Sequence, residues 1–323
     1  MKKQWSTIKL LLWIILCLSV TALIVLFVLN FRYLSTHFTE NNPHGELFKV
    51  VLTIIAGIIA IVALYYNHRR VTAIEKGNVD TRFNNAVGHL GDENPTVVLG
   101  DIHALHQIAV KHESYTQVVH NLFCSYLREN SAKLYDEKTP DKCPVIIQTL
   151  INYLFKPYNE EDSVYKDLKS DLSFSTLKNC RFGYTLTNCN FGKATLTECN
   201  FSDTIFTNCY FTEATFNGDL PLFIGSVFIN CHFGGVTFTN CHFSGTTFTN
   251  CDFNYAALTK CFFISPSKRT TLTNCDFRKV TLTKCGFISN TPHLVYSAEL
   301  FDCNLENIKL IDTELPPNKI SKA

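Results

Sequence analysis

The most regular pattern along the chain is an apolar residue, Phe or Leu, at every fifth position from about residue 172 to residue 310. A small residue, most often Cys, Ala or Thr, stands two positions before it. The pattern is strictest at Phe191, Leu196, Phe201, Phe206, Phe211 and Phe216, and again at Phe228, Phe233, Phe238, Phe243, Phe248 and Phe253. A period of five is neither the helical period of 3.6 nor simple strand alternation. The segment is therefore predicted to be neither a helix nor a set of ordinary strands.

The spacing predicts a solenoid. Residues two apart in an extended chain point to the same side, so the small residue and the Phe or Leu can share one interior. The next buried residue follows three positions later, which predicts a very short strand followed by a bend. Repeated bends of one hand stack coils around columns of side chains. With four sides per coil, Cys189 would lie under Cys209 and Cys231 under Cys251, whereas three sides would stack Cys on Ala, Thr or Val.

The repeat units read C-N-F-G-K-A-T-L-T-E at 189–198 and C-H-F-S-G-T-T-F-T-N at 241–250. This pattern resembles the pentapeptide-repeat family over residues 172–310. The resemblance implies a right-handed, four-sided pentapeptide-repeat β-helix with about twenty residues in each coil. The chain departs from the usual pattern by using Cys in place of Ala and Phe in place of Leu, which changes the packing of the columns rather than the fold.

The cysteines follow the repeat. Eleven of the fourteen lie in this region, at positions 180, 189, 199, 209, 231, 241, 251, 261, 275, 285 and 303. We expect these thiols to be buried and free of metal. We also expect them to be reduced, because a cytosolic compartment disfavours disulfides even where stacked cysteines come close enough to form them. The pairs Cys231-His232 and Cys241-His242 prompt a metal alternative. Neighbouring residues of an extended unit point to opposite sides, so neither pair can chelate one ion. We also expect the Asn residues that follow Thr, such as Asn208 and Asn250, to pair along the axis.

Two apolar runs precede the repeats. Residues 10–29 have membrane-spanning length, and residues 50–66 are at the lower end of that range. Basic residues flank the pair on the outside, so we predict a membrane hairpin over residues 1–70, with both termini and the repeat domain in the cytoplasm. A cleaved signal peptide is the alternative, but the first run is long and no small-residue cleavage site follows it. The predicted protein is therefore integral to the lipid bilayer of a bacterial inner membrane.

Residues 71–157 are predicted to form a helical neck. Asn94-Pro95 is a typical helix start, and Val98, Ile102, Leu105 and Ile108/Ala109 form one face of a helix over Thr96–Lys111. Ser114 and Gln117 suggest a capping box for a helix ending near Asn130, and Pro140–Phe155 suggests another with Val145, Ile146, Leu150 and Leu154 inside. The phrase LGDENPTVVLGDIHALHQIA resembles the helical segment between two membrane spans and pentapeptide repeats in some bacterial proteins. His103, His106, Asp101 and His112 suggest either a metal site or, as we expect, solvated histidines.

Composition narrows the function. The 323 residues carry a net charge of +1, and the repeat region has near-equal numbers of acidic and basic residues, so no face for nucleic acid is expected. No catalytic motif occurs, and we expect no catalytic, cofactor-binding or metal residue and no cofactor. The sequence predicts a non-enzymatic, membrane-anchored scaffold that binds an unknown protein partner. Two alternatives stay open: a DNA mimic that protects a topoisomerase, as the resemblance would allow, and an enzyme with a site in the helical neck.

Three places break the repeat, and we expect partner contacts to concentrate there. Phe216 to Phe228 is twelve residues, Phe263 to Leu272 is nine, and Phe287 to Leu305 is eighteen. A solenoid accommodates such breaks as loops on its outside, which are often its binding surface. Simple drift of the repeat is the other explanation. Residues 311–323 are expected to cap the last coil.

Overall fold

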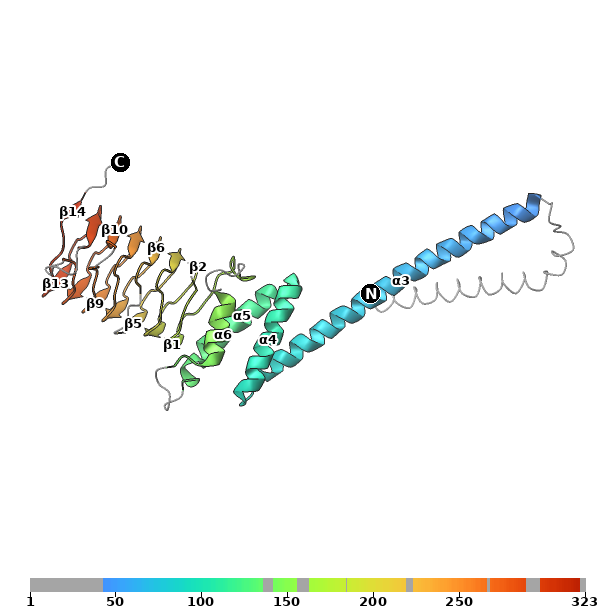
Figure 1. Cartoon of the computed structure of the whole chain (residues 1–323), viewed down its shortest axis with the longest axis horizontal. Coiled ribbons are helices and arrows are strands. Elements are labelled where there is room, and N and C mark those ends of the chain that lie inside the picture. The colour runs from blue at the N-terminus through green and yellow to red at the C-terminus, as the bar shows by residue number, and fades with distance from the viewer. Residues whose placement is uncertain are drawn as a thin grey trace, which may run out of the picture. The chain divides into compact units, whose positions relative to one another are not determined.

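A computed structural model describes residues 43–135, 142–155, 163–183, 185–218, 223–265, 268–288 and 297–319 (Figure 1). The chain divides into two compact units, Met1–Asn78 and Val79–Ala323. The first predicted membrane span, residues 10–29, lies outside the described residues.

Helix α3 (Pro43–His89) is a single helix of 47 residues. Its segment from Leu52 is apolar and long enough to cross a membrane, and its side chains are exposed. It is the one helix in the described part of the chain that meets this test. The sequence predicted that the span would end at residue 66. The helix continues beyond that residue to His89, because no proline follows and the two glycines, Gly77 and Gly88, are isolated. Of the two spans of the expected hairpin, the described residues thus contain one candidate helix.

Three further helices and a short 3-10 turn form the helical cap, which we define as residues 79–155: α4 (Pro95–Lys111), α5 (Glu113–Asn130), η1 (Ser131–Lys133) and α6 (Val145–Leu154). The predicted start of α4 is confirmed, since the Asn94 side chain accepts a hydrogen bond from the Thr96 amide at 3.0 Å. The apolar face of α4 is buried as expected.

Two predicted details of the cap are wrong. Helix α5 begins at Glu113 after His112, which makes no side-chain cap bond, so Ser114 and Gln117 lie inside the helix and form no capping box. Helix α6 starts at Val145 rather than near Pro140, and Val145 is 67% exposed. A first-turn residue can face solvent even when the following residues, here Ile146 and Leu150, are buried.

The repeats form the predicted solenoid of short strands and bends. Its strands are β1 (Thr176–Lys178), β2 (Thr185–Thr187), β3 (Thr195–Thr197), β4 (Ile205–Thr207), β5 (Thr215–Asn217), β6 (Val227–Ile229), β7 (Thr237–Thr239), β8 (Thr247–Thr249), β9 (Ala257–Thr259), β10 (Thr271–Thr273), β11 (Thr281–Thr283), β12 (Glu299–Phe301), β13 (Lys309–Ile311) and β14 (Asn318–Lys319). Odd-numbered strands make one parallel sheet and even-numbered strands make another. Because Leu196 pairs with Phe216 and Phe206 with Phe228, each residue stacks on one about a coil away.

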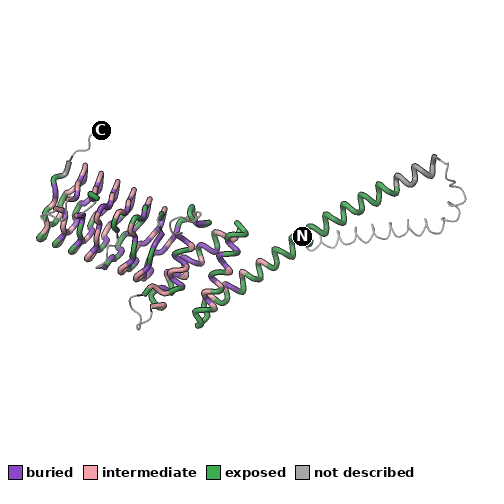
Figure 2. The backbone as a smooth tube through the Cα atoms, viewed as in Figure 1, coloured by how far each residue is buried: buried purple, intermediate pink, exposed green. Residues whose placement is uncertain are grey.

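Between the sheets run two rows of isolated bridges. The first bridge row is the series Asp171, Asn190, Tyr210, His232, Asp252, Asp276 and Asn304. The second bridge row contains Arg181 and Asn200, then His242, Phe262, Gly286 and Glu314. We extend the second row to the residues immediately around these bridges, because Phe223 and Gly225 donate backbone hydrogen bonds to the carbonyls of His242 and Ser244. Buried residues recur along every coil of the described solenoid (Figure 2).

The corners of the coils require left-handed backbone. Asn188, Asn208, Asn230, Asn250 and Asn274 all have φ between 51° and 55°. Asn tolerates this region better than most residues. Their side-chain amides also bond one another from coil to coil, at 3.4, 3.3, 3.1 and 2.9 Å. The predicted pairing of Asn along the axis is confirmed.

The helical cap closes the exposed edge of the first coil. The Ser131 hydroxyl accepts a hydrogen bond from the Thr176 amide at 2.9 Å, and the Tyr135 hydroxyl bonds both the amide and the carbonyl of Lys178. Gln148 does the same for the backbone of Arg181, at 2.9 and 2.7 Å. These side chains pair backbone groups that would otherwise form an open strand edge. The predicted cover of the first coil is therefore present, built from single side chains.

The other end of the solenoid is finished differently. Strand β14 pairs with β12 through Leu300↔Asn318 and Phe301↔Lys319, so the tail adds one strand to the even-numbered sheet. Strand β13 ends the odd-numbered sheet, and its Leu310 and Ile311 are 43% and 38% exposed. Within the described residues, the last coil is thus less covered than the first.

Candidate binding surface of the solenoid

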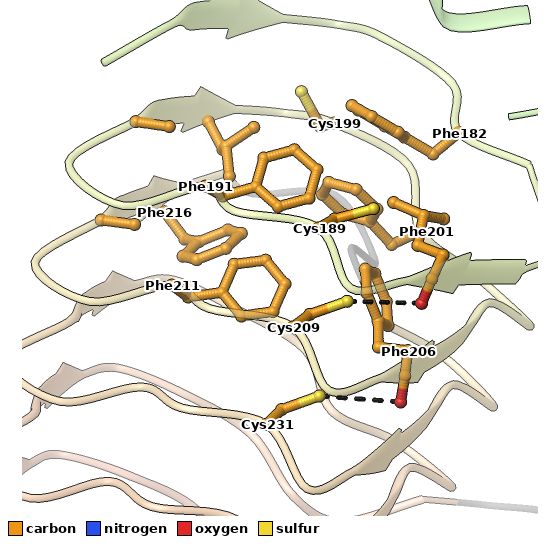
Figure 3. Close-up of a cluster of buried hydrophobic side chains, with 14 of the residues drawn as sticks. Phe182, Cys189, Phe191, Cys199, Phe201, Phe206, Cys209, Phe211, Phe216 and Cys231 are labelled. Atoms are coloured by element: carbon orange, nitrogen blue, oxygen red, sulfur yellow. Dashed lines mark hydrogen bonds between the residues drawn. The ribbon is translucent and has the colours of Figure 1, made fainter. Parts of the chain in front are cut away.

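The interior of the solenoid is packed and offers no site. Stacked rings form continuous columns, for example Phe201 on Phe223 at 5.4 Å and Phe223 on Phe243 at 5.1 Å between ring centroids. The thiols fill the remaining inward positions and are at most 7% exposed. Figure 3 shows Cys189, Cys209 and Cys231 one above another, with phenylalanine rings beside them. The predicted burial and stacking of the cysteines are confirmed, while their reduced, metal-free state stays a prediction.

The buried thiols donate hydrogen bonds to the backbone. Cys209 donates to the carbonyl of Leu186 at 3.3 Å, and Cys231 donates to that of Phe206 at 3.6 Å (Figure 3). A thiol in this position behaves as a small apolar group with one satisfied donor. The cysteine columns are therefore part of the core.

The outward residues of the two sheets are mainly threonines. Thr195 and Thr197 flank buried Leu196, and Thr237 and Thr239 flank buried Phe238. Threonine suits an exposed strand because its branched side chain fits the pleated surface. An apolar interruption occurs on the even-numbered sheet, where Ile205 lies beside Val227.

The first bridge row is polar, with aspartates as its charged residues, and basic side chains lie beside it. Tyr210 stacks on His232 at 4.8 Å. Asp276 bonds Arg278, which lowers the pKa of that carboxyl against the opposing effect of its partial burial. Close by, Lys193 lies 3.6 Å from Glu213. A surface of alternating charges does not reproduce the uniform negative charge of a nucleic acid.

The second bridge row presents apolar side chains between residues 224 and 288, among polar ones, and is the strongest candidate for a binding surface. Ile224 is 41% exposed and Phe262 is 38% exposed. Ile264 and Ile288 are half-buried on the same row. The ring of Phe262 stacks on His242 at 5.1 Å on one side. On the other side it covers Gly286, where an added Cβ would come within 3.2 Å of the ring. The absence of a side chain at Gly286 lets the Phe262 ring lie flat along the row.

The three breaks in the repeat all adjoin this row. The first break ends at Phe223, the second follows Ser265, and the third follows Ile288. Of the residues expected to form the loops (217–221, 265–269 and 290–293), 219–221, 266–267 and 290–293 lie outside the described residues. The described residues next to them border the second bridge row. This row was missed at the sequence level. Its signal was an Ile directly after the central Phe, at Phe223-Ile224, Phe263-Ile264 and Phe287-Ile288, where most other units have a polar residue or Gly.

An open pocket of about 360 Å³ lies beside the first bridge row, in the first coils of the solenoid. Lys169, Asp171, Asn190, Tyr210 and Thr212 are among its lining residues. Asp171 is already engaged, since it binds Arg128 at 2.8 Å and Asn190 at 3.0 Å. The pocket therefore presents Lys169 and the exposed ring of Tyr210 as its accessible groups.

The histidines of the helical cap do not converge on a metal site. His106 is buried rather than solvated as expected. It stacks on Tyr153 at 3.7 Å and bonds the Tyr165 hydroxyl at 3.2 Å. Asp101 lies 3.4 Å from His89. Within the described residues no group of three or more His, Cys, Asp or Glu side chains could hold a metal ion.

One buried pair in the cap has the atoms of a catalytic dyad. The Nε2 atom of His120 lies 3.0 Å from the Ser170 hydroxyl, and burial lowers the pKa of His120. His120 is fully buried and Ser170 is 3% exposed, so a substrate cannot reach the hydroxyl. Cys124, 3.7 Å from His120, has its pKa raised to about 12 by burial. This cluster joins the cap to the first coil and is structural.

Part of the repeat region matches the model of a known protein family. Residues 183–223 and 228–266 match the family model described as pentapeptide repeats (9 copies). Together with the strand register, this match defines the repeat region as a pentapeptide-repeat β-solenoid preceded by helices. Among curated proteins no sequence matches this chain.

Solved structures with low overall similarity include three pentapeptide-repeat proteins. HetL from Nostoc sp. strain PCC 7120, involved in heterocyst differentiation regulation, is 15% identical with a TM-score of 0.28, over 45% of this chain and 82% of that chain. QnrB1, a plasmid-mediated fluoroquinolone resistance protein, is 20% identical with a TM-score of 0.18, over 44% and 77%. Rfr23 from Cyanothece 51142 is 14% identical with a TM-score of 0.18, over 46% and 91%. Scores this low support no argument from the functions of these proteins.

Proposed function

We propose that this chain is a non-enzymatic, membrane-anchored scaffold that captures a protein partner on the second bridge row of its solenoid. The proposal includes a right-handed, four-sided coil, a membrane hairpin completed by residues 10–29, and a cytoplasmic location for the solenoid and both termini. The single observation that carries the binding proposal is the group of apolar side chains on this row, in which Ile224 and Phe262 are exposed and Ile264 and Ile288 are half-buried.

The chemistry of this row favours a protein partner. Exposed aliphatic and aromatic side chains gain free energy when another apolar surface removes them from water, by roughly 25 cal/mol for each Å². Aromatic residues such as Phe262 are enriched in the centres of protein interfaces. A nucleic acid or a DNA-mimic function would instead require a surface charged with one sign, and the aspartates of the first bridge row lie beside the basic side chains of Lys193 and Arg278. A protein partner is therefore the better match.

The anchor rests on the exposed surface of α3. Ile58, Ile61 and Leu64 are 56%, 68% and 68% exposed. A helix that is apolar on all sides is unfavourable in water and is typical of a membrane span. Basic residues Arg69 and Arg70 follow this segment, as expected for its cytoplasmic end.

The binding proposal can be tested with two matched variants in one coil. Ile224 and Thr212 each directly follow a central Phe and are both exposed, but Thr212 lies beside the first bridge row. We expect Ile224→Asp to reduce partner cross-linking to the full-length protein in native membranes at least tenfold, since a carboxylate would be buried unpaired. Thr212→Asp should leave cross-linking unchanged. Equal effects of the two substitutions, or no effect of Ile224→Asp, would contradict the proposal.

The topology can be tested separately. Reporter fusions placed after Arg70 and within residues 35–44 should report opposite compartments. If both reporters lie in the same compartment, the hairpin is wrong, whatever the binding experiment shows.

A further inference from the structure

Cys143 and Cys180 make a contact unlike any other described in the chain. Cys143 lies directly before Pro144, at the start of α6, and Cys180 belongs to the first coil. Their sulfur atoms are 2.9 Å apart. This separation is shorter than the contact distance of about 3.5–4.0 Å between unbonded carbon atoms, which are smaller than sulfur. The two thiols therefore lie close enough to interact directly.

The position of Cys180 in the column explains this contact. Cys199 in the next coil donates to a carbonyl of the coil before it, that of Leu177, at 3.3 Å. Cys180 is in the first coil and has the helical cap in that place. The cap supplies Cys143 and the hydroxyl of Tyr135, which lies 3.5 Å from the Cys180 sulfur.

The surroundings of the two sulfurs favour a proton on Cys143 over a proton on Cys180. Hydrogen bonds from Cys143, Cys199 and Tyr135 lower the pKa of Cys180, against the effect of its burial. The pKa of Cys143 is raised, first because its thiol donates to Cys180 and then by burial. Cys180 is thus the thiolate of the pair, and thiolates are the nucleophilic form of cysteine.

The two sulfurs also differ in their exposure to solvent, and here Cys143 is the more accessible one. Cys143 is half-buried, whereas Cys180 is 1% exposed. A small oxidant from solvent would therefore meet Cys143 first, with a nucleophile in contact behind it. Cys124, by contrast, is 2% exposed, so the same oxidant does not reach it and it serves as a control.

We propose that Cys143 and Cys180 form a site of oxidative modification, at which a peroxide produces a disulfide between the helical cap and the first coil. In the first step the Cys143 thiol gives its proton to the Cys180 thiolate, 2.9 Å away, and the Cys143 sulfur attacks one peroxide oxygen. The S–O bond forms as the O–O bond breaks and Cys143 becomes a sulfenic acid. The departing hydroxide takes the proton back from Cys180 and leaves as water. In the second step the Cys180 thiolate attacks the Cys143 sulfur, and the S–S bond forms as the S–O bond breaks. The departing hydroxide takes a proton, so two thiols are oxidised and hydrogen peroxide is reduced to two waters.

The disulfide would fasten α6 to the solenoid. Gln148 of α6 already bonds the backbone of Arg181 next to Cys180. A covalent link at the same place would hold the cap on the strand edge that it covers. Disulfides in a cytosolic protein are usually transient and redox-sensing, so reduction should restore the starting state.

The test uses the full-length reduced protein in membranes, treated with dilute hydrogen peroxide and analysed by peptide mass spectrometry under non-reducing conditions. We expect a Cys143–Cys180 linked peptide that dithiothreitol removes. Tyr135→Phe should slow its appearance severalfold more than Ser131→Ala, because Ser131 covers the same strand edge whereas Tyr135 also contacts the Cys180 sulfur. Cys124→Ser should leave the rate unchanged. Amide exchange at β1 should be slower in the oxidised wild-type protein than in the reduced one.

Two results would overturn the proposal. One is peroxide treatment that oxidises Cys143 to sulfinic acid with no link to Cys180. The other is a link between Cys180 and Cys199 in place of the predicted one. Both are visible in the wild-type protein, so neither depends on a variant that folds.

Discussion

The helical cap and the solenoid are stabilised in opposite ways. The solenoid repeats one set of contacts, in which Phe stacks on Phe, Cys lies above Cys and Asn bonds Asn. The cap relies on contacts that occur once, such as Ser131 to Thr176 and His120 to Ser170. The loss of one member of a repeated contact leaves the same contact in place in neighbouring coils. A single contact has no equivalent elsewhere, so removing one polar bond of the cap should open the strand edge that it covers.

The largest expected effect is in the solenoid core and tests how far repetition protects it. Phe243 stacks between Phe223 at 5.1 Å and Phe263 at 4.8 Å and is 1% exposed. Phe243→Ala should lower the free energy of unfolding by about 3–5 kcal/mol through lost burial and the cavity left behind. Denaturant unfolding measures this change. A loss below about 1 kcal/mol, which is typical of substitutions at the surface, would mean that the coils collapse around the gap.

The next effect tests the cap at its contact with β1. Ser131→Ala and Tyr135→Phe each leave backbone groups of β1 without a partner, which should cost about 1–3 kcal/mol for each substitution. Amide exchange should become faster at Thr176 and Lys178 while β7 stays protected, because distant coils do not share this contact. Thr116→Ala, which removes a hydroxyl bonded to the Ala109 carbonyl within the cap, is the matched control. Equal loss of protection in β7 would show that the solenoid unfolds as one unit.

A smaller expected effect is the dependence of stability on pH. It compares a buried histidine at the cap, His120, with an exposed histidine of the solenoid, His232. Burial lowers the pKa of His120 from its ordinary value of 6.5, and the groups facing it are Ser170, Asn121, Cys124 and the Tyr165 ring. The unfolded state therefore binds the proton more readily. Stability should be constant above about pH 7 and fall below pH 6.5, by at most about 1.4 kcal/mol for each pH unit.

The measurement is the thermal unfolding midpoint between pH 5 and 8. His120→Gln should remove most of the slope. His232→Gln should not, because His232 is exposed on the first bridge row. An unchanged slope in His120→Gln would assign the pH dependence to another group.

The smallest effect tests the corners of the coils. Lys260 is exposed and has a φ of 53°, a conformation that costs a residue with a Cβ about 1 kcal/mol. Lys260→Gly should therefore raise the free energy of unfolding by about 0.5 kcal/mol, after the greater flexibility of glycine in the unfolded chain is subtracted. Asn230→Gly should give no gain, since it also removes two bonds of the Asn ladder. A gain in both variants would mean that the ladder contributes nothing.

The sequence predicted the solenoid well because periodicity is a signal carried by many residues at once. The inward Phe and Cys positions, their stacking one coil apart and the Asn pairing all follow from it. The contacts of the cap could not be predicted in the same way. Ser131 and Thr176, or His120 and Ser170, are about fifty residues apart and belong to no repeating pattern. The apolar row was also hidden, because Ile224, Ile264 and Ile288 are unevenly spaced in the sequence and come onto one row only after the coils have stacked, with Ser244 between Ile224 and Ile264.

The position of the cap before the repeats has a consequence for synthesis on the ribosome. Each coil pairs only with its neighbours, and the cap, which supplies partners for the first one, is translated earlier. A finished cap can therefore act as a seed on which every new coil is laid down as it emerges, at roughly 5–20 residues per second. Growth in this order keeps only one strand edge exposed at any moment. A version of the chain with the cap moved to the C-terminus would have the same contacts in the end state but no seed at the start.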